Sequence, residues 1–368
     1  MKKVLSLILA LSLAVGLVGC GGPKSTVSNN GGENSTNSTA ETKPLKFAFF
    51  MFENSNTFTT YIRKGLEAYG KEHNVIVDSY DGKSDQSTQT DGITTALAKG
   101  QYDLIVVNPV DPGAASAINS LCKQYNVPVI YADRAPDLEG GALEDYEKAY
   151  YIGLDWSDPG YVQADMVYED WKNHRQKMDK NGDGILQYVI LQGNVAQQNA
   201  IFRCAAIDER FKGWAEDKSM VTERLDIQDG NWSSEKGKDI MDTWNVKFGD
   251  QIEAVLCNND TMAMGAAESI KTTGKYEKNT APYVYGINAI PDVWELIEGN
   301  YMRGSVLTSP YREAKAIIDI GINLCNDNDP LTGTSYKWGE FKKDIRIDDV
   351  AITSENLQVA QDDFAACM

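Results

Sequence analysis

The sequence predicts an α/β protein of two lobes, each a parallel β-sheet flanked by helices. Short apolar runs rich in β-branched and aromatic residues alternate with amphipathic stretches of helical length. The runs are apolar on both faces, which is typical of parallel strands covered by helices on both sides. Residues 44–368 also exceed what one core of ordinary size holds, so we expect two lobes.

The predicted strands and helices follow one another from residue 46 onward. In chain order the strands are KFAFFMF, VIVDSY, YDLIVVN, VPVIYAD, AYYIGLD, LQYVILQG, TERLDIQ, IEAVLCNN, YVYGIN and GSVLTS. Helical patterns include 57–69, 88–99, 114–125, 160–172, 200–216 and 261–273. In such sheets ligands bind beyond the carboxyl ends of the strands. The residues at those ends are unusually polar: Asn56, Asp133, Arg134, Asn259, Asp260, Asn288 and Thr308.

The N-terminus predicts secretion. Two lysines precede an apolar run over 4–18, which is too short to cross a hydrocarbon core of about 30 Å comfortably. We therefore predict a signal peptide at 1–19. The run ends in a pattern that resembles the bacterial lipoprotein box, so we expect Cys20 to be lipidated; an ordinary signal peptide beside an unrelated cysteine is the alternative. Residues 20–43, rich in Gly, Ser, Asn and Thr, predict a flexible tether.

Composition narrows the function classes further. The net charge of −18 argues against binding nucleic acid through bulk electrostatics. No later stretch is apolar enough to cross a membrane. The cysteines after Cys20 are odd in number and lack metal-ligand spacing, so we expect small core residues and predict no disulfide. They are Cys122, Cys204, Cys257, Cys325 and Cys367.

One local motif predicts a calcium site. Residues 179–187 place oxygen donors at alternate positions, with a glycine for the sharp turn, as in the first nine positions of an EF-hand loop. The predicted ligands are Asp179, Asn181, Asp183, the carbonyl of Ile185, and Gln187. The twelfth position is Ile190, where calcium needs a bidentate carboxylate, so one ligand must come from elsewhere. A solvated turn of Asp and Asn is the alternative.

Several motifs together resemble the galactose/glucose-binding periplasmic proteins of the ribose-type, type I binding-protein superfamily. They are DQSTQTDGITTALAKG (85–100), VNPVDP (107–112), YEKAYYIG (146–153), the calcium loop and NNDTMAMGA (258–266). The resemblance covers nearly all of the chain after the tether. It implies a type I two-lobed fold and a sugar ligand, galactose-like or glucose-like. In that family a glutamate shortly before the NND motif completes the calcium site, and it falls here on Glu253.

The resemblance also implies the sugar-binding residues. Aromatic faces suit the C–H surfaces of a sugar ring, and planar polar groups suit its hydroxyls. Phe58 and Trp232 would sandwich the ring, although core packing is the alternative for both. Arg203 would donate to the sugar unless it is a surface ion-pair former. The remaining expected contacts are Asn56, Asp133, Arg134, Gln197, Asn199, Asn259, Asn288 and Thr308.

Departures from the galactose pattern leave the sugar open. Asn56, Asn199 and Asn288 stand where that pattern has aspartates, while Asp133 replaces an asparagine, Thr308 another asparagine, and Gln197 a histidine. An amide adds donors that a carboxylate lacks. The Asp133–Arg134 pair resembles the pentose-binding branch, and fewer carboxylates around the two arginines would tolerate an acidic sugar. A pentose or an acidic sugar is therefore the alternative ligand.

We expect the two lobes to close on the ligand about three crossings, near 153–155, 308–310 and 343–348. This assigns 44–153 and 309–342 to one lobe, and 154–308 and 343–368 to the other. The resemblance implies an ABC-transporter permease as partner, and in some members a chemotaxis or sensor receptor. We expect a lipid-anchored monomer on the extracellular face of a bacterial membrane, with structural calcium.

Rival classes fit less well. An enzyme is disfavoured because the only histidines, His73 and His174, lie in polar helical contexts and no nucleophile elbow or phosphate loop is present. A transcriptional regulator of related fold would begin with a helix-turn-helix instead of a secretion signal. A sugar or signal sensor without transport remains an alternative.

Overall fold

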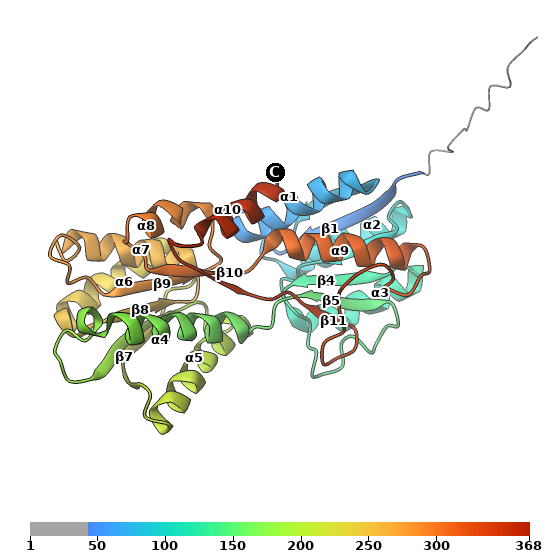
Figure 1. Ribbon diagram of the computed structural model, residues 1–368. Coiled ribbons are helices and arrows are strands. Elements are labelled where there is room, and N and C mark those ends of the chain that lie inside the picture. Colours follow the sequence, from blue (N-terminus) through green and yellow to red (C-terminus); the bar gives the residue numbers. More distant parts are fainter. Residues whose placement is uncertain (1–42) are drawn as a thin grey trace, which may run out of the picture. The chain divides into compact units, whose positions relative to one another are not determined.

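The computed structural model describes residues 43–368. The predicted signal peptide, the predicted lipidation site Cys20 and the predicted tether up to residue 42 lie outside this range. Within it, the chain forms two six-stranded sheets, each in its own lobe (Figure 1). We call them the N-lobe and the C-lobe.

The N-lobe sheet has the strand order β11-β5-β4-β3-β1-β2, and every neighbouring pair is parallel. Its strands are β1 (Leu45–Met51), β2 (Val75–Asp81), β3 (Leu104–Val107), β4 (Val129–Asp133), β5 (Ala149–Gly153) and β11 (Asp344–Arg346). The helices are α1 (Thr57–Glu72), α2 (Gln86–Lys99), α3 (Ala115–Tyr125) and α9 (Pro310–Cys325), with the short η1 (Pro112–Ala114). One core cluster lies under α1 and α9, and another lies under α2 and α3.

The C-lobe sheet has the order β12-β10-β9-β8-β6-β7, with only β12 antiparallel to its neighbour. Its strands are β6 (Ile185–Gln192), β7 (Val221–Asp229), β8 (Ala254–Cys257), β9 (Tyr283–Ile287), β10 (Gly304–Leu307) and β12 (Val350–Ile352). The helices are α4 (Asp158–Met178), α5 (Gln198–Glu216), α6 (Ser234–Lys247), α7 (Asp260–Thr272), α8 (Trp294–Glu298) and α10 (Leu357–Ala366), with η2 (Gly249–Gln251) and η3 (Pro291–Val293). Helices α4 and α5 cover one face, while α6, α7, α8 and α10 cover the other.

The predicted fold class is confirmed, and each of the ten predicted strands and six predicted helices is present. The reason is the two-sided apolar character of the strands. All four residues of β3, of β8 and of β10 are buried, as expected where helices cover both faces of a sheet.

The chain passes between the two sheets three times: after β5, after β10 and after β11. The third crossing lies within the predicted 343–348, but the predicted lobe boundary is wrong, because it assigns all of 343–368 to the second lobe. Strand β11 instead pairs with β5 in the N-lobe sheet, so the crossing follows Arg346. The reason is that Ile345 is buried in the N-lobe core, where it completes the edge of the sheet.

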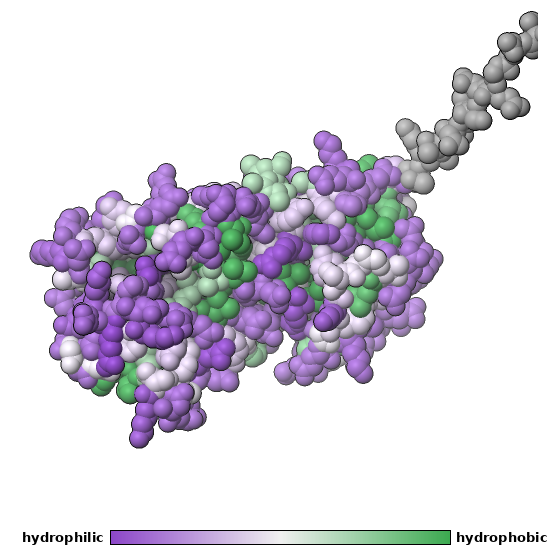
Figure 2. Space-filling view, in the orientation of Figure 1, coloured by the Kyte–Doolittle hydropathy of each residue, from purple (hydrophilic) through white to green (hydrophobic). Residues whose placement is uncertain are grey.

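Apolar side chains are largely withdrawn from the surface. Figure 2 shows a mainly hydrophilic face with separate, smaller hydrophobic patches. The five cysteines within 43–368 are free, and all but Cys325 are buried, as predicted for core residues. In this range no helix combines the length and the apolar character needed to span a membrane.

Candidate functional site

Two adjoining cavities lie where the carboxyl ends of the two sheets meet. Their volumes are about 470 and about 450 Å³, and both are lined by Asp133 and Arg134 of the N-lobe and by Gln197, Asn199 and Arg203 of the C-lobe. Because they share these five residues, we treat them as one cleft between the lobes. Its position is the one expected for a ligand site in parallel α/β sheets.

The fold brings together nearly all of the sugar-binding residues predicted from the sequence. The larger cavity is lined by Asn56, Phe58, Asp133, Arg134, Gln197, Asn199, Arg203, Trp232, Asn259 and Asn288. Thr308 is fully buried and lines neither cavity. Its hydroxyl oxygen accepts a hydrogen bond of 2.7 Å from Nδ2 of Asn288. Thr308 therefore orients Asn288 from behind the cleft wall and leaves the amide oxygen of Asn288 available as an acceptor.

Two asparagines of the cleft also cap helices, and this determines which of their atoms remain available. Asn56 is the N-cap of α1, and its Oδ1 accepts from the backbone N–H of Thr59 at 3.0 Å. Asn259 is the N-cap of α7, and its Oδ1 accepts from the N–H of Met262 at 3.0 Å. In both residues the oxygen is used locally, so the NH₂ group is the part left to donate to a ligand.

Arg203 is the most buried charged group in the cleft wall. It lies on α5, only 6% of its surface is exposed, and its Nη1 donates to the carbonyl of Asn258 at 2.6 Å. Burial lowers the pKa of its guanidinium, and the carboxylates of Asp349 and Asp133 oppose that shift. Its Nε is buried with no hydrogen-bond partner in the described chain. Arg203 is therefore a cleft arginine and not a surface ion-pair former.

Asp133 ends β4 in a left-handed conformation with φ of 57°. Its backbone N–H donates to Oε1 of Glu313 at 2.6 Å, and its Oδ2 accepts from Nδ2 of Asn108 at 2.9 Å. Burial raises the pKa of Asp133, while Arg134 and Asn108 oppose the rise. Glu313 is fully buried, and burial together with the nearby Asp133 raises its pKa well above the usual range. Glu313 thus holds, through this backbone hydrogen bond, the strand end that presents Asp133 to the cleft.

Aromatic rings line the cleft from both lobes. Phe58 is half-buried on α1 against the N-lobe core, and Trp232 is half-buried beside the C-lobe core. The indole Nε1 of Trp232 donates to Oε1 of Gln197 at 2.8 Å, which sets the plane of the ring. The predicted pair of rings is therefore present with one ring in each lobe.

Some cleft residues escape prediction from the sequence. Phe52 lies under Arg134, whose guanidinium carbon is 3.7 Å from the ring centroid. Trp156, just after the first crossing, lines the smaller cavity, and its ring lies 5.7 Å from that of Phe202 between centroids, tilted by 38°. Both sit within a few residues of a strand end, and that position is the signal that could have identified them.

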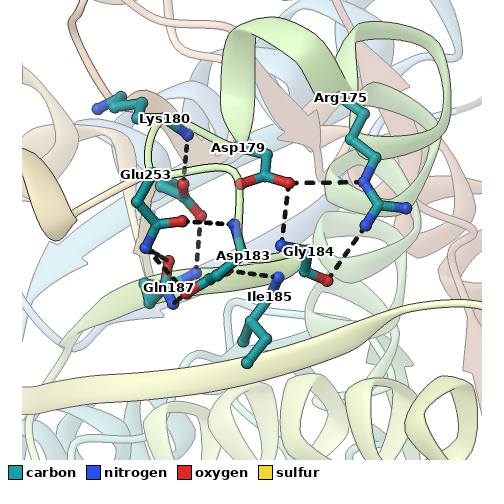
Figure 3. A network of polar contacts seen from close by, with 9 residues as sticks. Arg175, Asp179, Lys180, Asp183, Gly184, Ile185, Gln187 and Glu253 are labelled. Atoms are coloured by element: carbon teal, nitrogen blue, oxygen red, sulfur yellow. Dashed lines mark hydrogen bonds and ion pairs between the residues drawn. The ribbon is translucent and has the colours of Figure 1, made fainter.

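In the loop 179–187 and beside it, carboxylate oxygens of Asp179, Asp183 and Glu253 accept hydrogen bonds from N–H groups of the loop, as Figure 3 shows. Glu253, just before β8, reaches it from outside the motif: its Oε1 accepts from the N–H of Lys180 at 2.7 Å and its Oε2 from that of Gln187 at 2.9 Å. Gln187 and Asn181 donate to Oδ2 of Asp183 at 2.8 and 2.9 Å.

The residues of this loop fit a hard cation. Oδ1 of Asp179 is buried without a hydrogen-bond partner in the described chain, although the other oxygen accepts from Gly184 at 3.1 Å. Burial raises the pKa of Glu253, and the neighbouring Asp179 adds to the rise. Converging carboxylates with an unpartnered oxygen are what a cation would stabilise. Within 43–368 no group of three or more His, Cys, Asp or Glu side chains forms a metal cluster, so amide and carbonyl oxygens are needed to complete the set.

Comparison with known proteins places the chain in a family. Residues 47–329 match the family described as periplasmic binding protein domain. The D-galactose/methyl-galactoside binding periplasmic protein of Haemophilus influenzae is 31% identical over 309 residues, which are 83% of this chain and 89% of the relative. The ribose import binding protein of Bacillus subtilis is 26% identical, over 75% of this chain and 79% of its own.

A solved structure has the same fold. It is an ABC transporter periplasmic solute binding protein from Actinobacillus succinogenes 130z with bound D-allose. It is 20% identical, with a TM-score of 0.71, and the match covers 86% of this chain and 99% of the other. These relatives are binding proteins and not enzymes, in agreement with the prediction. The chain therefore belongs to the periplasmic binding protein family and has its type I, two-lobed fold.

Proposed function

We propose that this protein captures a monosaccharide of the galactose or glucose kind between its lobes and delivers it to the permease of an ABC transporter. The observation that carries the proposal is the cleft itself, where Phe58 and Trp232 come from opposite lobes and Arg203 stands among amide groups. Its larger cavity, about 470 Å³, is within the range of small-molecule sites. The galactose-binding and ribose-binding relatives support a sugar ligand.

Each part of the cleft suits one part of a sugar. The apolar faces of Phe58 and Trp232 would cover the C–H surfaces of the ring. The NH₂ groups of Asn56 and Asn259 would donate to hydroxyl oxygens, and Asp133 would accept from hydroxyl groups. Donors and acceptors at fixed positions would select the hydroxyl pattern, because an unpaired buried polar group costs about 1–3 kcal/mol.

An acidic sugar is a second candidate, supported by the donors in the cleft. The cap bonds at Asn56 and Asn259 leave amide N–H groups, and not oxygens, toward the cavity. Arg134 and Arg203 add two cations to the same walls. A ligand carboxylate would accept from such groups in strong, charge-assisted hydrogen bonds. The ribose-binding relative supports a neutral pentose as another alternative ligand.

We expect binding to proceed by closure of the lobes about the three crossings, with the closed surface recognised by the permease. A sensor receptor is the alternative partner. The lipoprotein-like pattern ending at Cys20 supports anchoring of the protein to the outer face of the membrane.

We also propose that the loop 179–187 holds a structural calcium ion. Asp179, Asn181, Asp183, Gln187 and Glu253 would supply side-chain oxygens, and Ile185 would supply its backbone carbonyl. The unpartnered, buried Oδ1 of Asp179 supports this proposal. Bound calcium would neutralise the converging carboxylates and tie the start of β6 to the residue before β8.

Removing calcium should lower the thermal stability of the protein. At free calcium about 1,000 times its Kd, the ion would contribute about 4 kcal/mol to the free energy of unfolding, and a chelator would abolish this. In Glu253→Gln the midpoint of thermal unfolding should not respond to the chelator, because the variant lacks the proposed bidentate carboxylate ligand of calcium. Asp239→Asn, an exposed carboxylate on α6, is the matched control and should respond like the unmodified protein. A chelator without effect on the unmodified protein would contradict calcium binding.

The sugar proposal is tested by a thermal-shift screen of the secreted protein with calcium present. The panel is D-galactose, D-glucose, D-ribose, D-allose and D-galacturonate. A ligand at about 1,000 times its Kd raises the free energy of unfolding by about 4 kcal/mol, so a true ligand gives a large rise in the midpoint. We expect one or more sugars to do so, and D-galacturonate to do so if the ligand is acidic. No shift with any of the five would overturn the proposed ligand class.

A further inference from the structure

Asp349 is a buried carboxylate without a hydrogen-bond partner, located on the third crossing. It directly precedes β12 and follows the exposed Asp348. Both of its carboxylate oxygens are buried, and neither has a hydrogen-bond partner in the described chain. A buried carboxylate in this condition is costly, because its desolvation is not offset by any hydrogen bond. Such a group would be stabilised by a hydrogen-bond donor that reaches it in another state of the protein.

A cleft residue that acts electrostatically on Asp349 has an unpartnered donor. Nε of Arg203 is buried and without a hydrogen-bond partner in the described chain, whereas its Nη1 is held by the carbonyl of Asn258. Among carboxylates, Asp349 has the largest effect on the pKa of Arg203, after the lowering caused by burial. Arg203 forms no ion pair with any carboxylate between residues 43 and 368. The acid and the base are therefore electrostatic neighbours that are not in contact.

Four charged groups from different elements act on Asp349. Asp155 lies on the first crossing, Asp158 begins α4, Arg203 comes from α5 and Arg312 from α9. Burial raises the pKa of Asp349 to about 8; Arg203 and Arg312 lower it, and Asp158 and Asp155 raise it. At neutral pH the carboxyl is thus largely protonated while its oxygens lack partners.

We propose that Asp349 is the positioning residue of the cleft arginine: in the ligand-bound protein its carboxylate accepts the Nε–H of Arg203 and fixes the plane of the guanidinium. The inference rests on the proposed capture of a ligand in the cleft. One hydrogen bond would satisfy two groups that are now unpartnered, one on α5 of the C-lobe and one on a crossing between the lobes. Movement about the crossings is what would bring them together.

The proposal couples ligand binding to pH, with a definite sign. Pairing with Arg203 stabilises the ionised form of Asp349, so its pKa is lower in the bound protein than in the free one. Below the free pKa of about 8, binding releases a proton, and the dissociation constant rises as the pH falls. For a single group the limit is about tenfold per pH unit, and the dependence disappears above about pH 8.5.

The test is calorimetric titration of the secreted protein with D-galactose, D-glucose, D-ribose, D-allose and D-galacturonate. Titrations at about pH 7 in buffers of different ionisation enthalpy count the protons released. The unmodified protein should release up to one proton per ligand bound. Asp349→Asn should lose this release and bind about tenfold more weakly above pH 8, because it lacks the ionised partner of Arg203. Asp348→Asn, the exposed neighbour on the same crossing, should behave like the unmodified protein.

A second variant separates positioning from a merely structural role. Asp158→Asn removes a like charge that raises the pKa of Asp349, so the pH profile should move to lower pH while affinity at high pH is retained. Proton release that persists in Asp349→Asn, or a dissociation constant of the unmodified protein that does not depend on pH, would overturn the proposal. If the unmodified protein binds none of the five sugars, the proposed function fails first, and the role of Asp349 fails with it.

Discussion

Replacing Arg203 with methionine is expected to weaken sugar binding by about ten- to a hundredfold, because a hydrogen bond to a charged group is worth about 1.5–3 kcal/mol. Arg203 lines both parts of the cleft and is 6% exposed, so a ligand there meets its guanidinium away from bulk water. Methionine keeps much of the length and apolar stem but has no donor. Isothermal titration with the best sugar of the thermal-shift screen measures the loss.

The same substitution should change the stability of the protein little, because it removes the desolvation cost of the guanidinium but also the donor to the carbonyl of Asn258. Burial of the Arg203 guanidinium is unfavourable, and its Nε has no hydrogen-bond partner in the described chain. Arg210→Met is the matched control. It lies on the same helix, and its side chain is 46% exposed and pairs with Asp165 at 3.3 Å. We expect it to change binding little, and stability by less than about 1 kcal/mol. If Arg203→Met bound sugar with the affinity of the unmodified protein, Arg203 would not be part of the binding site.

Changing Gly193 to alanine should weaken binding about tenfold or more without changing any group that contacts the ligand. Gly193 follows β6, and the indole ring of Trp232 lies directly against it. A Cβ there would overlap Cη2 and Cζ2 of the ring and stand 2.6 Å from Cε2. The ring would have to leave the position held by Gln197. Apolar burial of one large side chain is worth about 1.5–3 kcal/mol, which sets the size of the effect.

A double-mutant cycle shows whether this effect passes through Trp232. In a Trp232→Ala background the ring is already absent, so Gly193→Ala should have no additional effect on binding. Gly213→Ala on the exposed face of α5 is the control, since a Cβ there meets no atom within 4 Å. Equal affinities of Gly193→Ala and the unmodified protein would indicate that the ring of Trp232 does not bind the ligand in this position.

Much of the fold could be predicted because the relevant signals are local. Strands such as β3 and β8 are short, wholly apolar and bounded by polar residues, and helices such as α1 and α7 begin at an asparagine that caps them. Polar residues at strand ends also predicted most of the cleft, because the carboxyl ends of parallel strands meet at one edge of the sheet. The third crossing lies within its predicted range, but the lobe boundary at residue 343 was wrong, since β11 has only three residues and belongs to the N-lobe through its pairing with β5.

Other features depended on contacts between distant parts of the chain. Glu253 contacts the loop 179–187 because β8 pairs with β6. The loop motif alone does not predict this residue, which was predicted only from the family resemblance. Thr308 and Asn288 both follow strands, yet Thr308 is buried and is hydrogen-bonded to Asn288, which lines the cleft. Nothing in the sequence distinguishes Asp349 and Glu313 from other acidic residues. Only the fold shows that they have buried carboxyl oxygens without a hydrogen-bond partner in the described chain.

The amino-acid pattern thus specifies the alternating α/β elements, the polar strand ends and the calcium-like loop, since each arises from neighbours in the chain. Folding adds the direction in which each polar atom faces. Asn56 offers its NH₂ group to the cleft because its oxygen caps α1, and Arg203 is buried because α5 packs beside the end of β8. Such choices depend on hydrogen bonds and burial that exist only once the two sheets are assembled.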